Sequence, residues 1–406
     1  MNSTTTLKRT LSLPQMILYG LGTTVGAGIY ALIGELAGIS GYLAPIAFLF
    51  AAILAGLTAL SFAELSCRYP RAAGAALYTQ QGFHSHTLTQ IIGLLVILAG
   101  LVSSAALINA FSGYLDQLIN IDRTVTIILI TMLLTAIAVY GIAESVFLAS
   151  IITLIEVGGL IWIIFIRQGA IEQLPELGQQ LIPEFNLTNL SIIFSGTLLA
   201  FYAFIGFEDM VDVAEEVKDV KRNLPLAILI TLGITSVLYI LIMILAVLSI
   251  PPEQLAQSQA PLATLFTFHT GRSAEIISVI SILAIINGSL IQIIMASRVI
   301  YGLSSRHQLP KLFSYIHPKT QTPLMATMLS GLIVVLMALI GHLSSLAEIT
   351  SFLMLIVFSI VNLALWRIKQ IEPTIEGCIC LPRYVALLAF ISSTSFVIIS
   401  IYSRLA

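Results

Sequence analysis

The sequence predicts an all-α membrane protein. Hydrophobic residues make up 58% of its 406 residues and charged residues only 9%, whereas soluble domains carry about 25% charged residues. A membrane-crossing helix needs about 20 apolar residues. Runs of roughly that length cover 13–38, 42–65, 87–115, 124–140, 145–166, 190–213, 224–250, 274–303, 324–340, 344–366 and 384–401. No run alternates as a membrane barrel requires, so we expect a single transmembrane domain over 1–406 with about 11 helices in the lipid bilayer.

The first run contains the stretch Gly22-Thr-Thr-Val-Gly-Ala-Gly-Ile-Tyr30. Glycine in a helix interior costs about 1 kcal/mol relative to alanine, and unwound backbone at membrane depth must line a cavity or be buried in protein. The stretch therefore predicts a break at the membrane midplane, where free amides and carbonyls would bind a zwitterion such as an amino acid. The alternative is that Gly22 and Gly26 form a small-residue face for close helix packing. A nucleotide-binding loop is excluded because no strand precedes the glycines and no lysine follows Gly28.

A second interruption lies in the sixth run, at Phe201-Tyr-Ala-Phe-Ile-Gly-Phe-Glu-Asp209. Gly206 and two acidic residues interrupt the apolar pattern there. Five helices, counting the first broken one, separate the two interruptions, which is typical of an inverted five-helix repeat with both breaks at a shared site. We expect a first repeat over 13–166, a second over 190–366 and an additional C-terminal helix over 384–401.

Polar residues at mid-membrane depth provide further candidates. Glu156 lies in the fifth run, and its nearest basic neighbour in sequence, Arg167, is about three helical turns away. An intramembrane carboxyl group is by default a functional candidate that faces a cavity or a proton path; the alternative is a protonated or hydrogen-bonded glutamate with a structural role. Ser104 either bonds back to its own helix or lines the cavity. Asn287, Gly288 and Ser289 either make interhelical contacts or complete an ion site.

Charge distribution predicts the orientation. With a cytoplasmic N-terminus, fourteen of the 18 Lys and Arg residues fall on the inside, and only Arg123, Arg167, Arg272 and Arg404 fall outside, as the positive-inside rule requires. No basic patch with interleaved aromatic residues indicates nucleic acid as a partner.

The cysteines and histidines do not indicate a metal site or a cofactor. Cys67, Cys378 and Cys380 all fall on the inner, reducing side, where they are expected to stay thiols. The Cys378-Ile-Cys380 pair has no matching second pair. His84 and His86 lack the helical spacing of metal ligands, so we expect solvated loop residues.

Four ordered stretches resemble motifs of the amino acid-polyamine-organocation permeases. Gly22 to Tyr30 resembles the signature of the family's first helix. The other three stretches are 64–70 (Glu-Leu-Ser-Cys-Arg-Tyr-Pro), 201–225 with its Phe-Ile-Gly-Phe-Glu core, and 297–310. The resemblance covers about 11–383.

The resemblance implies the leucine-transporter fold, with helices 1 and 6 broken, and alternating-access transport of amino acids or related amines. Backbone amides of the first break would hold the substrate carboxylate, and carbonyls of the second break would hold its amine. The substrate-binding residues expected on this basis are Thr23, Thr24, Val25, Gly26, Ala27, Gly28, Phe204, Ile205, Gly206, Phe207 and Glu208. Glu156 occupies a position where several proton-coupled relatives have a lysine, which leaves the coupling mechanism open.

We therefore expect a secondary active amino acid permease of the cytoplasmic membrane, multi-pass, with a cytoplasmic N-terminus and proton coupling through Glu156. Three alternatives stay open: an amine, polyamine or amino acid exchanger, a sodium-coupled transporter, and a sensor that binds amino acids without transport. An enzyme is not expected, because no histidine lies at mid-membrane depth near a serine or cysteine nucleophile.

Overall fold

The computed structural model describes residues 9–71, 74–140, 146–184, 186–271, 273–305 and 309–405, without the side chains at 26–27, 146–149, 269 and 403–405. The α-helices are α1 Leu13–Ser40, α2 Ala44–Arg68, α3 Gly74–Phe83, α4 His86–Asp116, α5 Arg123–Tyr140, α6 Val146–Arg167, α7 Leu174–Leu177, α8 Leu187–Phe201, α9 Val220–Ser249, α10 Pro252–Ala256, α11 Pro261–Thr270, α12 Glu275–Ser305, α13 Leu324–Ile340, α14 Leu343–Ile371 and α15 Arg383–Leu405. The 3-10 helices are η1 Gly41–Leu43, η2 Gln168–Gln173, η3 Gly178–Leu181, η4 Tyr202–Phe204, η5 Phe207–Glu216 and η6 Lys311–Ser314.

Nine helical segments of the described residues are long and apolar enough to cross a membrane. The first, Leu13–Arg68, contains both α1 and α2, and α13 is slightly shorter than this length. Together they account for the eleven expected helices, so the prediction of an all-α, multi-pass membrane protein is confirmed. The helix bounds agree with the apolar runs to within a few residues, except at α8, which ends early.

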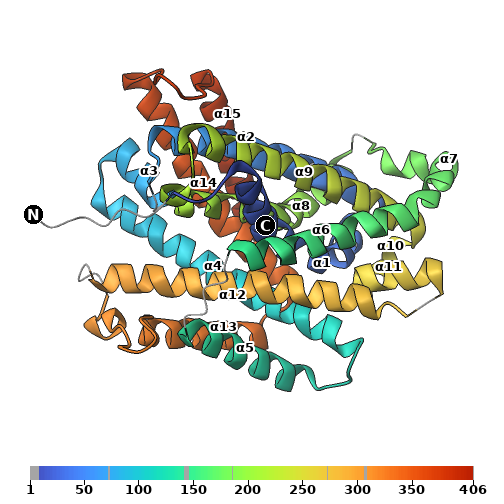
Figure 1. The fold of residues 1–406 in the computed structure, drawn as a ribbon. Helices are drawn as coiled ribbons and strands as arrows, with labels where there is room; N and C mark the ends of the chain where they lie inside the picture. The colour runs from blue at the N-terminus through green and yellow to red at the C-terminus, as the bar shows by residue number, and fades with distance from the viewer. Residues whose placement is uncertain are drawn as a thin grey trace, which may run out of the picture.

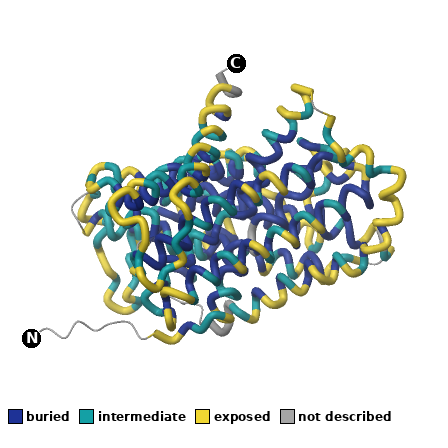
Figure 2. The backbone as a smooth tube through the Cα atoms, turned by 90° about the horizontal axis from the view of Figure 1, so that it is seen from above, coloured by how far each residue is buried: buried dark blue, intermediate teal, exposed yellow. Residues whose placement is uncertain are grey.

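Helix α1 lies at the centre of the bundle, where it packs against α6, α8, α9 and α12 (Figure 1). Around it, α4 packs along α12, and α2 packs along α9. Figure 2 shows that the buried residues follow the middle of the bundle, whereas the C-terminal end of α15 projects from it and is exposed. The residues of α1, α4, α12 and the α8 break therefore converge at the centre. The inverted relation between the two halves stays a prediction.

The expected break in the first helix is wrong, because α1 is helical from Leu13 to Ser40. Its glycines instead allow close packing. A Cβ atom on Gly22 would lie 2.3 Å from Thr153 Oγ1, and one on Gly28 would lie 2.2 Å from the Cα of Ala203. Helix α6 and the η4 turn thus pack against α1 where only a glycine fits. At Gly22 this is the small-residue packing that we considered as the alternative.

The expectation that all three cysteines are thiols is also wrong, because Cys67 and Cys378 form a disulfide with their Cα atoms 5.7 Å apart. Cys380 is free. A buried charge cluster brings the two bonded cysteines together: Glu64 Oε1 accepts hydrogen bonds from Arg68 at 2.8 and 3.0 Å and pairs with Lys369, while Glu64 Oε2 accepts the Leu381 N–H at 3.0 Å. The loop between α14 and α15 is thereby held on the end of α2, a tertiary contact that the sequence pattern does not reveal.

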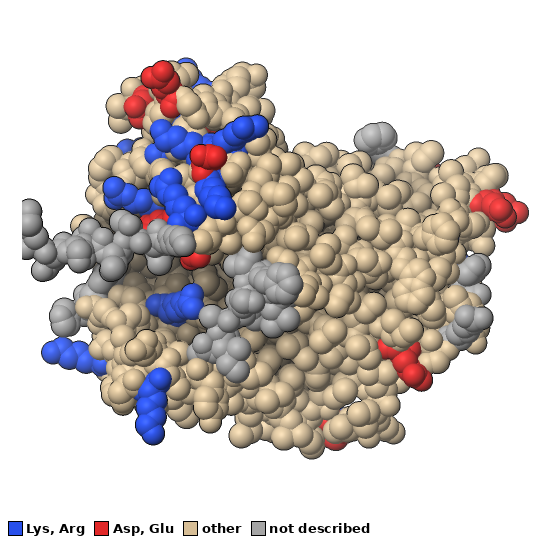
Figure 3. Space-filling model, in the orientation of Figure 1, with Lys and Arg blue, Asp and Glu red and all other residues tan. Residues whose placement is uncertain are grey.

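Basic side chains gather at one end of the bundle. On the face drawn in Figure 3, Lys and Arg lie mainly at the left, the end at which Figure 1 places α3. This end is the one that the positive-inside rule assigns to the cytoplasm, and the sidedness itself stays a prediction.

Candidate functional site

The predicted interruption at Gly206 is confirmed. Helix α8 ends at Phe201, the single turn η4 follows, and Ile205 is extended with φ −66° and ψ 138°. Gly206 then has φ 123°, a conformation that side-chain-bearing residues rarely adopt. The chain continues as η5, so that a membrane-spanning segment is broken at its middle.

The break is fixed directly on α1. The Thr23 hydroxyl donates to the Gly206 carbonyl at 3.0 Å, and a Cβ atom on Gly206 would lie 2.4 Å from the Thr23 carbonyl oxygen. On the other side, the Gly206 N–H donates to Glu208 Oε2 at 2.8 Å. The break leaves peptide groups without helical hydrogen bonds. Side chains satisfy part of them, as buried backbone groups require.

A small cavity, which we call the central cavity, lies beside this contact. It holds about 10 Å³, which is room for roughly one water molecule. The residues that line it come from α1, α4, the α8 break and α12, and are Thr23, Ser103, Leu107, Tyr202, Ile205, Asp209, Gly288, Ile291 and Gln292. The site is therefore contracted in this conformation, and a larger ligand requires these helices to separate.

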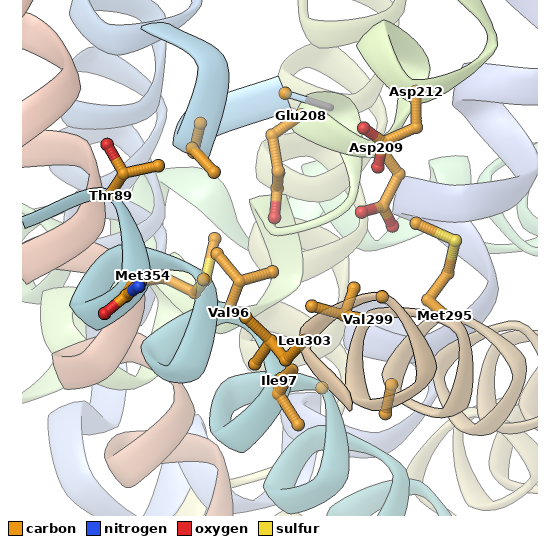
Figure 4. Close-up of a pocket in the computed structure, with 18 of the residues that line it drawn as sticks. Thr89, Val96, Ile97, Glu208, Asp209, Asp212, Met295, Val299, Leu303 and Met354 are labelled. Atoms are coloured by element: carbon orange, nitrogen blue, oxygen red, sulfur yellow. The ribbon is translucent and has the colours of Figure 1, made fainter. Parts of the chain in front are cut away.

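A second, larger cavity of about 250 Å³, the vestibule, leads from the central cavity toward the α3 end. Asp209 and Gln292 line both cavities and stand between them. In Figure 4, the carboxyl groups of Glu208 and Asp209 on η5 face the apolar side chains of Val96 on α4 and Val299 on α12. The vestibule thus connects the broken helix to one end of the bundle.

Helix α3 also contains a buried phenol, although this residue does not line the vestibule. Tyr78 is 0% exposed, and its hydroxyl has no hydrogen-bond partner among the described residues. Burial raises the pKa of Tyr78 well above its ordinary value, and the nearby carboxyl group of Asp212 raises this pKa further. The phenol is therefore neutral at physiological pH.

Several of the predicted substrate-binding residues contribute their side chains to the protein core. Val25 is fully buried on α1. Phe204 packs against Phe48 and Tyr239, and Phe207 packs against Phe62 and Phe358. Only their backbone groups remain available to a ligand. The side chains at Gly26 and Ala27, also part of the prediction, lie outside the described residues.

The polar residues of α4 and α12 divide into two roles. The hydroxyls of Ser104 and Ser289 are 2.7 Å apart and join these two helices, which is interhelical contact rather than cavity lining. Gly288 lines the central cavity. Asn287 is 3% exposed, and its Oδ1 has no hydrogen-bond partner among the described residues.

Glu156 is fully buried at the middle of α6, where α6 packs on α1. Its backbone carbonyl accepts the Tyr30 hydroxyl at 2.6 Å. Tyr239 on α9 donates to the Thr24 carbonyl at 2.9 Å. The residue of α6 that lies against Gly22 is Thr153, one turn before Glu156. The backbone of Glu156 is therefore bonded to α1 through Tyr30, and α9 is bonded to α1 through Tyr239.

Six residues that line the central cavity were not among the predicted site residues: Ser103, Leu107, Tyr202, Asp209, Ile291 and Gln292. The Tyr202 hydroxyl lies 3.0 Å from Ser103 Oγ and closes one side. Tyr202 and Leu107 carry no polar anomaly that would distinguish them from core residues. Asp209 could have been found, because it directly follows Glu208 at the same depth.

A bundle of membrane-crossing helices, one of them broken beside a small central cavity, defines the class of a multi-pass membrane protein. Residues 11–404 match the amino acid permease family, and the chain belongs to this family. This result confirms the resemblance seen in the four motifs and places the chain among permeases rather than enzymes.

Three relatives illustrate the range of the family. The chain is 26% identical over 389 residues to cationic amino acid transporter 3, mitochondrial, of Arabidopsis thaliana, covering 91% of this chain and 64% of the relative. It is 26% identical over 391 residues to a branched-chain amino acid permease of Bacillus subtilis (strain 168), covering 90% and 82%. It is 25% identical over 396 residues to the methylthioribose transporter of the same organism, covering 93% and 84%.

The chain spans 61–64% of the length of the cationic amino acid transporters that it matches. The relatives' names refer to cationic amino acids, branched-chain amino acids and a thio-sugar. Membership of the family therefore leaves the substrate open.

Proposed function

We propose that the protein is a secondary active amino acid transporter that works by alternating access in the cytoplasmic membrane, with its N-terminus in the cytoplasm. The observation that carries this proposal is the broken helix at Gly206, held against α1 at a contracted cavity that continues into a vestibule. Backbone groups freed at a break bind the charged groups of a small zwitterion without the cost of burying an ionised side chain.

A small central cavity with a vestibule on one side is the arrangement expected of one conformation in an alternating-access cycle. The vestibule extends along α4 from His86 to Gly100, which is about 21 Å at 1.5 Å per residue. A substrate that enters the central cavity must push α1, α4 and α12 apart, because the present volume fits about one water. Binding would therefore favour a different arrangement of these helices, which is the requirement for coupling binding to conformational change.

A ligand screen tests the substrate class. We expect an amino acid with a free carboxylate and amine to raise the melting temperature of the purified protein, by the equivalent of about 2.7 kcal/mol at a hundredfold excess over Kd. An amide of the same amino acid, which lacks the carboxylate, is the matched control. Stabilisation by diamines or polyamines alone would instead identify an amine exchanger and contradict the proposal.

We further propose that Glu156 carries the coupling proton. An ionised carboxyl group at this buried position is costly in the membrane, whereas a protonated one is neutral and can donate a hydrogen bond. Because α6 packs on α1 at Glu156, where the Tyr30 hydroxyl of α1 donates to the Glu156 backbone carbonyl, loss of the proton would change the contact between α6 and α1. Proton binding would then bias one conformation over the other.

Uptake into proteoliposomes tests the coupling. We expect a pH gradient to drive accumulation by the parent protein, and Glu156→Gln to exchange substrate without responding to that gradient. The Glu275→Gln variant, which changes an exposed glutamate at the start of α12, is the control. Accumulation that follows a sodium gradient and ignores pH would show that sodium is the coupling ion. Exchange without any gradient response in the parent would identify an exchanger.

A further inference from the structure

The vestibule differs chemically from the central cavity. Most of its wall is apolar: Val96 and Ile97 from α4, Met295, Val299 and Leu303 from α12, and Met354 from α14. Thio-ether and branched side chains of this kind pack well against a hydrophobic ligand and adapt to its shape. At about 250 Å³, the cavity approaches the roughly 300 Å³ at which small-molecule sites begin.

One wall of the vestibule is acidic. Glu208, Asp209 and Asp212 all line it from η5, and no Lys or Arg is found among its described lining residues. Glu208 is held near the break by its hydrogen bond to the Gly206 amide. Asp209 Oδ2 is buried and has no hydrogen-bond partner among the described residues. A cation placed at this oxygen would satisfy it.

The two walls together select for a ligand class. A hydrophobic body gains free energy when it leaves water for the apolar wall. A positive charge is attracted to the acidic wall, whereas a carboxylate is repelled by it, more strongly than in water because the surroundings are of low dielectric constant. Amino acids carry both charges, so the vestibule suits them poorly.

We propose that the vestibule is a binding site for hydrophobic organic ammonium ions that lack a carboxylate, with the ammonium group at Asp209 and the apolar body between α4 and α12. This site adjoins the central cavity, with which it shares Asp209 and Gln292, and ligand binding there does not depend on the proposed transport function. A bound ligand fills the space between η5 and α12, so it opposes any movement that closes the vestibule. Such compounds would therefore act as inhibitors of a working transporter.

Binding to the purified full-length protein tests the proposal with three matched probes: phenylbutylamine, phenylbutanol and phenylbutyrate. We expect the amine to raise the melting temperature in a saturable manner, the alcohol to act only at much higher concentration, and the acid to have no effect. Asp209→Asn should weaken amine binding by at least about tenfold, the effect of a lost charge-assisted hydrogen bond. Asp219→Asn is the matched control, because this residue is exposed, follows η5 and does not line the vestibule.

A second variant keeps the test independent of the stability of Asp209→Asn. Val299→Trp places a large side chain in the vestibule and should abolish amine binding. Equal stabilisation by the amine and the alcohol, or unchanged amine affinity in both Asp209→Asn and Val299→Trp, would overturn the proposal. Because binding is measured directly, failure of the transport assays leaves this result unaffected.

Discussion

Replacement of Gly206 by alanine tests the contact between the break and α1. The new methyl group is unfavourable for two reasons, the backbone conformation and a steric overlap. A φ of 123° is unfavourable for any residue with a Cβ, at a cost of about 1–3 kcal/mol, and the Cβ would lie 2.4 Å from Thr23 O and 2.7 Å from Thr23 C. These are backbone atoms of a long helix that cannot rotate away, and overpacking of this kind costs a further 1–3 kcal/mol or so. We expect a total loss of about 4 kcal/mol.

The melting temperature of the purified protein measures this loss. At about 2 °C per kcal/mol, Gly206→Ala should melt about 5–10 °C below the parent. Gly377→Ala is the matched control, because Gly377 has φ 79° but nothing within 4 Å of its Cβ position, so it reports the backbone strain alone. If Gly206→Ala melts no lower than Gly377→Ala, the break does not rest on Thr23 as described.

Three further outcomes follow from the packing. Gly28→Ala should lower the melting temperature, because its Cβ would lie 2.2 Å from the backbone of Ala203; Gly233→Ala in open space on α9 is the control, and equal melting of the two would exclude the close approach. Glu64→Gln should destabilise by about 3–5 kcal/mol, because it leaves two buried cations without their anion; a denaturation midpoint unchanged from the parent would argue against that cluster. Alkylation under non-reducing, denaturing conditions should label one of the three cysteines and all three after reduction, and mass spectrometry that finds three labels without reductant would rule out the Cys67–Cys378 bond.

Hydropathy alone was sufficient to predict most of the fold. Helix bounds such as those of α13 at Leu324–Ile340 agree residue for residue with the apolar run, because the bilayer requires continuous apolar helices of a fixed length. The short helices α3, α10 and α11 were not predicted, since they lie outside the long apolar runs and depend on tertiary contacts. The disulfide was missed for a similar reason. Its two cysteines are 311 residues apart in the sequence, and buried charges hold the loop that contains Cys378 on the end of α2.

The candidate site was predicted in part. Gly206 could be identified because glycine and two acids interrupt an apolar run, and the structure confirms a break there. Gly28 carries the same sequence signal but serves close packing against Ala203. A glycine marks a place where a side chain does not fit, and the sequence does not reveal whether backbone conformation or a neighbour is the cause. At Tyr202 the sequence contains no pattern that distinguishes a cavity residue from a core residue.

The most direct test of the central cavity as the substrate site is a counterflow measurement with a variant that fills it. Ile291 lines the central cavity, and Ile291→Trp should fill the small space that α1, α4 and α12 leave there. Ile276→Trp, at a 61% exposed position on the same helix, is the control. In proteoliposomes loaded with the amino acid found in the ligand screen, we predict transient accumulation of labelled amino acid by the parent and by Ile276→Trp, and none by a folded Ile291→Trp. Accumulation by Ile291→Trp at the rate of the parent would contradict a substrate path through this cavity.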